Sequence, residues 1–151
     1  MPEIYISNSE NETEEIAFKL AERKKILQGD IIALCGGLGA GKTAFTRGLA
    51  RFFSPSSRVT SPTFSIVNEY KTNNGNSKIF HFDMYRINSE EDLLSIGFYD
   101  YLDGKNIIIV EWFDNIAEFF SEETNDIEIK KISQDEREII FERITHADTR
   151  N

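Results

Sequence analysis

The sequence has very few of the residues that form disulfides or bind structural zinc. A single cysteine, Cys35, occurs among 151 residues, which excludes an internal disulfide. It ends an apolar run, so we expect an inert core thiol rather than a reactive one. The two histidines, His81 and His146, stand far apart in the sequence and do not form a zinc-binding pattern. We therefore expect a protein without disulfides and without zinc.

Long apolar runs and an excess of basic residues are also missing. No segment approaches the ~20 apolar residues of a membrane-spanning helix, and residues 1–25 lack the basic stretch and apolar core of a secretion signal. Because 17 Lys and Arg stand against 26 Asp and Glu, the net charge is −9. This disfavours direct nucleic-acid binding, which needs clustered cations. We expect a cytoplasmic protein without membrane contact that reaches any nucleic acid only through a partner.

The most informative stretch is rich in glycine. Residues 36–43 read Gly-Gly-Leu-Gly-Ala-Gly-Lys-Thr, a complete GxxxxGK[ST] pattern, and follow directly on the apolar run 30–35. A buried strand, a glycine turn and a helix N-terminus in this order surround a phosphate with backbone N–H groups. The stretch therefore predicts a P-loop that binds a nucleoside triphosphate and Mg²⁺.

Each residue type in this loop suits a particular task. Gly36, Gly39 and Gly41 permit backbone angles and close approaches that a side chain would block. Lys42 is expected to reach the β- and γ-phosphate oxygens, and Thr43 to offer its hydroxyl to Mg²⁺, which prefers oxygen ligands. No NKxD-type guanine signature is present, and the loop itself reads only phosphates, so the residues alone leave both ATP and GTP open.

Periodicity and turn residues predict an α/β fold of the P-loop NTPase type, with three layers and a mainly parallel central sheet extended by antiparallel hairpins. No repeat or linker interrupts the chain, so we expect one domain over residues 1–151 with a polar tail from about residue 146. The expected strands cover 3–7, 30–35, an extended segment ending near 70, 78–83, 106–110, 126–132 and 137–144. The expected helices cover about 11–25, 43–52, 89–97 and 112–120, and Phe45, Leu49 and Phe52 form the core-facing side of the second.

Two acidic residues follow predicted strands, as a P-loop requires of the carboxylate near its metal. Asp83 ends the run 79–82 and Glu111 ends the run 107–110. We expect one of them to hold Mg²⁺ or its water shell, and the other is a candidate for orienting the attacking water. His81 is interpreted as a strand residue on the same sheet face as Asp83, not as a metal ligand.

Four further residues have two interpretations each. Thr63, in the stretch 61–64, is either a hydroxyl of a switch that senses the γ-phosphate or part of a proline turn, and the residues alone favour the turn. Tyr85 and Arg86 are either a surface packing pair or a partner contact. Trp112 is as consistent with the core as with the site.

Several of these motifs together resemble the TsaE (YjeE) family of bacterial P-loop ATPases. The resemblance covers about residues 30–115 and implies ATP binding and slow hydrolysis. It implies that this hydrolysis is required for threonylcarbamoyladenosine at position 37 of ANN-decoding tRNAs, and that the protein acts on a TsaB–TsaD complex. The motifs are residues 36–43, Ser61-Pro62-Thr63-Phe64 with Tyr70, residues 81–86, Ile96-Gly97-Phe98 and Val110-Glu111-Trp112.

The resemblance also implies roles for individual residues. Its catalytic set is Lys42, Thr63, Asp83 and Glu111, and its magnesium set is Thr43, Asp83 and Glu111. Its nucleotide-binding set is Ser9, Thr13, Gly36, Leu38, Gly39, Ala40, Gly41, Lys42, Thr43, Ala44, Trp112 and Arg137. It favours functional over merely structural roles for Tyr85, Arg86 and Trp112. Phe113-Asp114 depart from the family, which usually has a proline and a polar residue there.

Two other classes of function share a P-loop. A small-molecule kinase needs an arginine-bearing lid and an acceptor pocket, and after Glu111 only Arg137 and Arg143 are lid candidates. A nucleotide-dependent scaffold that does not hydrolyse its ligand is favoured if Asp83 and Glu111 lie far from the phosphates. The ATPase of tRNA modification remains the leading hypothesis.

Overall fold

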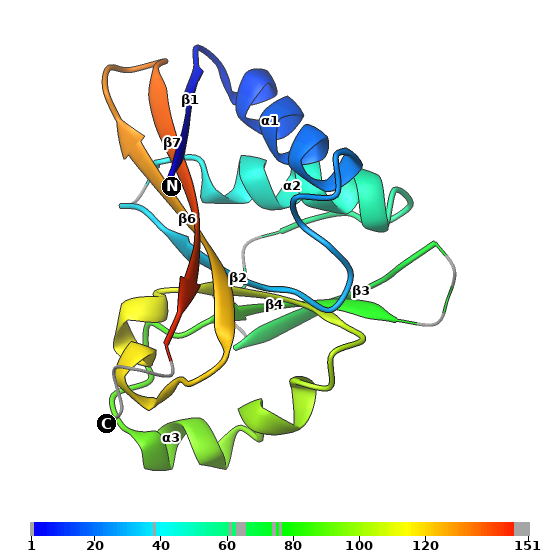
Figure 1. Cartoon of the computed structure of the whole chain (residues 1–151), viewed down its shortest axis with the longest axis vertical. Helices are drawn as coiled ribbons and strands as arrows, with labels where there is room; N and C mark the ends of the chain where they lie inside the picture. The colour runs from blue at the N-terminus through cyan, green and yellow to red at the C-terminus, as the bar shows by residue number, and fades with distance from the viewer. Residues whose placement is uncertain are drawn as a thin grey trace.

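A seven-stranded sheet forms the centre of the computed structural model, which describes residues 2–37, 39–60, 62, 66–73, 75 and 77–146 (Figure 1). The strands are β1 (Glu3–Ser7), β2 (Ile31–Cys35), β3 (Val67–Lys71), β4 (Lys78–Asp83), β5 (Ile107–Glu111), β6 (Glu123–Lys131) and β7 (Arg137–Thr145). Their order across the sheet is β1-β7-β6-β2-β5-β4-β3.

The middle of the sheet is parallel and both edges are antiparallel. Strand β2 pairs in parallel with β5 and β6, and β5 pairs in parallel with β4. The hairpins β3–β4 and β6–β7 and the pair β1–β7 are antiparallel. This confirms the predicted fold class. Because β2, β5 and β4 run the same way, their carboxyl ends meet at one edge, where α/β proteins place their ligands.

Helices cover both faces of the sheet. Helices α1 (Glu10–Glu22) and α2 (Lys42–Phe53) pack on one face, while α3 (Glu90–Ser95) and the 3₁₀ turns η1 (Phe98–Tyr101), η2 (Phe113–Asn115) and η3 (Ala117–Phe119) pack on the other (Figure 1). In the described part of the chain, no helix combines the length and the apolar character needed to cross a bilayer.

Strand β5 shows why the sheet needs both layers. Its residues are all buried, with Ile107 and Ile109 in the cluster below α1 and α2, and Ile108 and Val110 in the opposite cluster. A continuous apolar strand of this kind is typical of parallel sheets covered on both faces. The alternation fixes the register, so the last residue of the strand, Glu111, lies at the edge where the parallel strands end.

Helices α1 and α2 cross at very short distance because Gly48 has no side chain. A Cβ atom at Gly48 would lie 2.1 Å from the carbonyl oxygen of Glu14 and 2.7 Å from the Cβ of Ala17. Only glycine lets the two backbones approach this closely. The contact sets the position of α1 relative to the P-loop helix.

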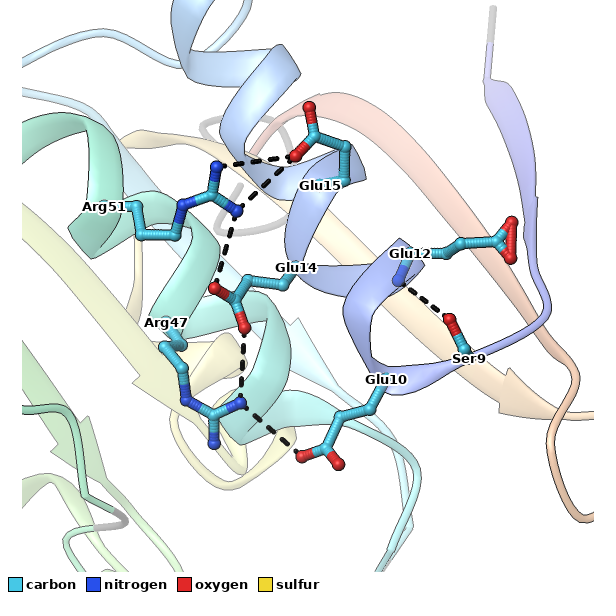
Figure 2. A network of polar contacts seen from close by, with 7 residues as sticks. All are labelled: Ser9, Glu10, Glu12, Glu14, Glu15, Arg47 and Arg51. Atoms are coloured by element: carbon cyan, nitrogen blue, oxygen red, sulfur yellow. Dashed lines mark hydrogen bonds and ion pairs between the residues drawn. The ribbon is translucent and has the colours of Figure 1, made fainter.

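Ion pairs at the edge of this contact also join the two helices (Figure 2). Arg47 lies 3.5 Å from Glu10 and 3.4 Å from Glu14, and Arg51 lies 3.4 Å from both Glu14 and Glu15. Both arginine side chains are about two-fifths exposed, so each pair contributes little, on the order of 1 kcal/mol or less. Since two guanidinium groups share Glu14, the network fixes the rotation of α1 more than it adds stability.

Two sequence expectations are wrong. Residues 112–120 do not form a continuous helix, because Trp112 adopts a left-handed conformation with φ of 60° and two separate 3₁₀ turns follow. Phe52, expected in the core, is 36% exposed and packs edge-on against Phe18 and Phe53, whereas Phe45 and Leu49 are fully buried as predicted.

Candidate functional site

A cavity of about 830 Å³ bordered by described residues lies at the carboxyl ends of the parallel strands. The P-loop, α1, the ends of β4 and β5 and the turn between β6 and β7 all contribute to its wall. Most residues of the predicted site lie in this wall: Ser9, Thr13, Gly39, Ala40, Gly41, Lys42, Thr43, Ala44, Asp83, Glu111, Trp112 and Arg137.

Three predicted residues are not among the described residues of that wall. Leu38 and Thr63 lie outside the described residues, so their predicted roles stay predictions. Gly36 is described but does not line the cavity. A Cβ atom there would lie 2.9 Å from the carbonyl oxygen of Ile129, so its glycine lets the chain leave β2 close to β6.

The P-loop passes directly from β2 into α2. Gly41 caps the helix in a left-handed conformation with φ of 112°, and its carbonyl accepts a hydrogen bond from the N–H of Phe45 at 3.0 Å. The preceding turn is closed by the N–H of Ala40, which donates to Gly37 at 3.2 Å. The N-terminus of α2 therefore faces the cavity with Lys42 and Thr43 as its first residues, and anions bind at such a position.

Lys42 is nearly buried beside a carboxylate and an indole ring. Its Nζ lies 3.7 Å from Oε1 of Glu111 and 5.1 Å from the centroid of the Trp112 ring. A buried ammonium needs such compensation because burial removes its hydration. Phosphate oxygens that bind Lys42 would compete with Glu111 for the same charge.

Glu111 is held from its other side by His81. Its Oε2 lies 2.5 Å from Nε2 of His81, which is completely buried on β4. Burial by itself would raise the pKa of Glu111, but the hydrogen bond with His81 and the charges of His81 and Lys42 bring the pKa below its usual value. Glu111 is therefore ionised at neutral pH in spite of its burial.

The contact with Glu111 determines which nitrogen of the His81 ring carries a proton. Among the described residues, Nδ1 has no hydrogen-bond partner. Because an ionised carboxylate only accepts hydrogen bonds, Nε2 is the nitrogen that donates to Glu111. Our sequence interpretation placed His81 on a strand face with Asp83 and missed its contact with Glu111.

Asp83 ends β4 directly beside Glu111 in the parallel register of β4 and β5. Its Oδ1 accepts a hydrogen bond from the N–H of Tyr85 at 2.9 Å, which leaves Oδ2 for a ligand. Together with the hydroxyl of Thr43, the two carboxylates give the cavity three hard oxygen donors. Mg²⁺ prefers oxygen donors of this kind and is commonly bound by one or two carboxylates together with phosphates. The residues present therefore fit a magnesium ion bound together with phosphates.

The wall formed by α1 is built around two hydroxyl groups. Ser9 caps α1 by accepting a hydrogen bond from the N–H of Glu12 at 3.1 Å (Figure 2). Thr13 is 1% exposed, and its hydroxyl lies 2.7 Å from that of Ser7. Both residues therefore also stabilise the start of α1, in addition to the nucleotide contact predicted for them.

Aromatic and basic side chains form the outer rim. The Trp112 ring lies 5.1 Å from that of Tyr85, in an edge-to-face arrangement, and Tyr85 is 61% exposed. Tyr85 and Arg86 both line the cavity, which favours a functional role over a surface packing pair. Trp112 is 37% exposed, so it belongs to the rim and not to the core.

Several other lining residues had no signal in the sequence. Ile66, Ile87, Gln134 and Asp135 come from loops whose course depends on the completed sheet. Only their proximity to the strand ends of β4 and the β6–β7 hairpin offered a hint. Cys35, just before the P-loop, is only half-buried, so its expected place in the core is wrong. Burial nevertheless raises its pKa to about 12, which disfavours the reactive thiolate.

The two arginines considered for a kinase lid lie in different places. Arg137 contacts the P-loop, with its Nε donating to Ala40 at 2.9 Å. Arg143 donates to Glu123 at 2.7 Å and to Asn125 at 3.0 Å, beside Asp30 at the amino end of β2. Arg143 therefore lies at the opposite end of the parallel strands from the cavity and cannot close over it.

Comparison with known proteins shows the family of this chain. The family model described as "Threonylcarbamoyl adenosine biosynthesis protein TsaE" matches residues 7–139. The tRNA threonylcarbamoyladenosine biosynthesis protein TsaE of Bacillus subtilis is 42% identical over 75% of this chain and 69% of its own length. The TsaE protein of Rickettsia typhi is 38% identical over 86% of this chain and 88% of its own length.

A solved structure agrees with the sequence comparison. The crystal structure of Bacillus subtilis YdiB matches with a TM-score of 0.75 and 33% identity, and the match covers 96% of this chain and 86% of that chain. The P-loop, Asp83 and Glu111 all lie within the residues that the family model matches. The chain therefore belongs to the TsaE family, which serves the biosynthesis of threonylcarbamoyladenosine in tRNA.

Proposed function

We propose that the protein is a magnesium-dependent ATPase that hydrolyses ATP slowly alone and faster with TsaB and TsaD. One observation carries this proposal: Lys42, Thr43, Asp83 and Glu111 border a single cavity at the carboxyl ends of the parallel strands. This arrangement also disfavours a scaffold that does not hydrolyse its nucleotide, because both acids lie beside the P-loop and not far from it.

In this proposal, each side chain has a task that its environment supports. Lys42 binds β- and γ-phosphate oxygens, and Gly41 and Ala44 contribute backbone N–H groups at the start of α2. Thr43, Asp83 and Glu111 hold Mg²⁺ directly or through its water shell. When bound, the ion would neutralise charge on the phosphates.

Glu111 is the better candidate for orienting the attacking water. Its low pKa keeps it ionised, so a carboxylate oxygen is ready to accept a hydrogen bond from water. The water oxygen forms a bond to the γ-phosphorus, and the bond from that phosphorus to the bridging oxygen breaks, so that ADP leaves with this oxygen and the bonding electron pair. One water proton stays on the phosphate formed and the other is released to solvent. Because P-loop catalysis depends on positioning, a carboxylate fixed by His81 and Lys42 suits this role.

Partners and location are part of the same proposal. With a net charge of −9, the protein is poorly suited to hold tRNA by itself. We place it in the cytoplasm, where it reaches tRNA through the TsaB–TsaD complex and couples ATP turnover to threonylcarbamoyladenosine formation. It has no small-molecule acceptor of its own, in contrast to a kinase.

Phosphate release tests the proposal. We would follow phosphate released from ATP with Mg²⁺ by the protein alone, then with TsaB and TsaD of the same organism, and measure threonylcarbamoyladenosine in the tRNA. Lys42→Ala is the inactive variant, and Lys130→Ala, an exposed lysine on β6, is its matched control. If TsaB and TsaD leave the rate unchanged, the partner-dependent ATPase is wrong.

A further inference from the structure

The side chain of Arg137 spans from the first residue of β7 to the backbone of the P-loop. Its Nε donates to the carbonyl of Ala40 at 2.9 Å, and its Nη2 donates to the carbonyl of Gly39 at 3.0 Å. These are charge-assisted hydrogen bonds, which are shorter and stronger than neutral ones. The planar guanidinium contacts two consecutive carbonyls of the loop at once, which a lysine cannot do.

The same guanidinium also holds the turn between β6 and β7. Its Nη1 donates to the carbonyls of Ser133, Gln134 and Glu136 at 2.9 to 3.0 Å. Since Nη1 carries two hydrogens, one of them is shared between acceptors. Arg137 therefore joins the adjoining β6–β7 turn and β7 to the P-loop, although 97 residues separate it from Ala40.

The bond to Ala40 has a direct consequence for the phosphate site. In a trans peptide the C=O and the next N–H point in opposite directions. With the Ala40 carbonyl directed to Arg137, the N–H of Gly41 is directed to the other side of the loop. The bond to Gly39 meanwhile supports the turn that the N–H of Ala40 closes on Gly37. Gly39 and Gly41, with φ of 74° and 112°, lack a Cβ that would restrict their backbone.

We propose that Arg137 is a positioning residue that presets the P-loop backbone for the phosphates, and that this is its main role. The inference rests on the proposed nucleotide binding and deepens it. It differs from a direct contact between Arg137 and the nucleotide, for which Nη2 retains only one N–H beyond its bond to Gly39. A preset loop binds phosphate more tightly because it loses less freedom on binding.

Two ligands separate the two roles of Arg137. We would measure the affinities of ATP and of inorganic tripolyphosphate, each with Mg²⁺, by calorimetry on wild type and on Arg137→Lys. The lysine keeps the charge but not the two-carbonyl geometry. We expect both ligands to bind about tenfold more weakly, by the same factor. Loss of affinity for ATP alone, with tripolyphosphate unchanged, would show a contact with the nucleoside and overturn the proposal.

A measurement without ligand completes the test. We expect the amide ¹⁵N heteronuclear NOE values of Gly39, Ala40 and Gly41 to fall in nucleotide-free Arg137→Lys, because the loop becomes more mobile on the fast timescale that this NOE reports. Unchanged values would overturn the proposal even if phosphate binding weakened, since that combination indicates direct contact with the phosphates. The NOE comparison needs no ligand. If wild type fails to bind ATP, the proposed function is wrong, but the comparison still tests whether Arg137 holds the loop.

A control and a rescue exclude a general loss of stability. Arg143→Lys changes another arginine of β7 that lies away from the loop, and we expect unchanged affinities and NOE values. Added guanidinium ion at millimolar concentration should partly restore tripolyphosphate binding to Arg137→Ala. If that variant is folded by its thermal transition and no rescue occurs, the geometric role of the guanidinium is contradicted.

Discussion

The imidazole of His81 and the carboxylate of Glu111 lie 2.5 Å apart, on neighbouring parallel strands and almost completely shielded from solvent. The two residues are not opposite each other in the register, where His81 faces Ile109 and Glu111 faces Asp83. The contact between His81 and Glu111 therefore runs diagonally across the paired strands β4 and β5. It gives the proposed catalytic carboxylate a fixed orientation before any ligand arrives.

Substitution of His81 tests that orientation. His81→Phe keeps an aromatic ring but loses the N–H that donates to Glu111. We expect this variant to lower kcat for ATP hydrolysis about 10-fold or more while KM changes little. His81→Gln, which retains a donor, should keep more of the activity. His146→Gln changes the other histidine and should leave kcat unchanged. Equal kcat in wild type and His81→Phe, measured by phosphate release, would contradict the positioning role.

Lys42 and Glu111 should have separable effects although they lie 3.7 Å apart. Lys42→Ala is expected to abolish nucleotide binding, because it removes the cation of the phosphate site. Glu111→Gln, similar in shape but neutral, should bind ATP nearly as well and turn it over about 100-fold more slowly. Calorimetry and phosphate release measure the two effects. Full turnover by Glu111→Gln, with exposed Glu118→Gln as control, would rule out its catalytic role.

Gly48→Ala should destabilise the protein although alanine is the better helix former. The added methyl group would overlap the backbone of α1, and overpacking of this kind costs about 1–3 kcal/mol. We expect the midpoint of thermal unfolding to fall by about 2–10 °C. Gly37→Ala is the matched control for stability only, since a Cβ there meets no described atom within 4 Å. A rise in Tm for Gly48→Ala would mean that α1 moves away without cost.

Asp126 on β6 predicts a pH effect on stability. Burial, with the nearby charges of Glu142 and Asp114, raises its pKa above the ordinary value of 3.8, against the hydrogen bond from Thr124. The folded protein thus holds this proton more tightly than the unfolded chain, so stability falls as the pH rises through the raised pKa. Asp126→Asn has no ionisable group at this position, so its stability does not fall over this pH range. We expect the Tm of Asp126→Asn to exceed that of wild type at about pH 7, and the difference in Tm to shrink at about pH 4. An equal difference in Tm at the two pH values would show that Asp126 does not cause the pH effect.

The parts of the site that could be predicted are those with a local cause. The P-loop needs only a strand, glycines and a helix start in sequence, and Glu111 needs only a buried strand that ends in an acid. Both signals lie within a few residues. The fold class was equally accessible, because the strands that are buried on both faces read as apolar runs.

What could not be predicted depends on contacts between distant segments. The contact of His81 with Glu111 follows from the β4–β5 register, and the need for Gly48 follows from the crossing of α1 and α2. Arg137 was expected near the nucleotide, but its bonds to Gly39 and Ala40 depend on where β7 lies beside the loop. The left-handed conformation of Trp112, which stands where the helix 112–120 was expected to begin, gave no signal in the sequence.

The pairing of β1 with β7 has a consequence for synthesis on the ribosome. Residues 3–7 find their neighbours only when residues 137–145 have emerged, so the edge of the sheet cannot close early. Helix α1 follows β1, and Arg137 begins β7, so two walls of the cavity are also completed at that late point. A nascent chain therefore lacks the complete wall of the proposed nucleotide site until β7 has emerged. If the protein binds nucleotide as proposed, we expect a chain that terminates prematurely within β7 to gain no protection from proteolysis by nucleotide.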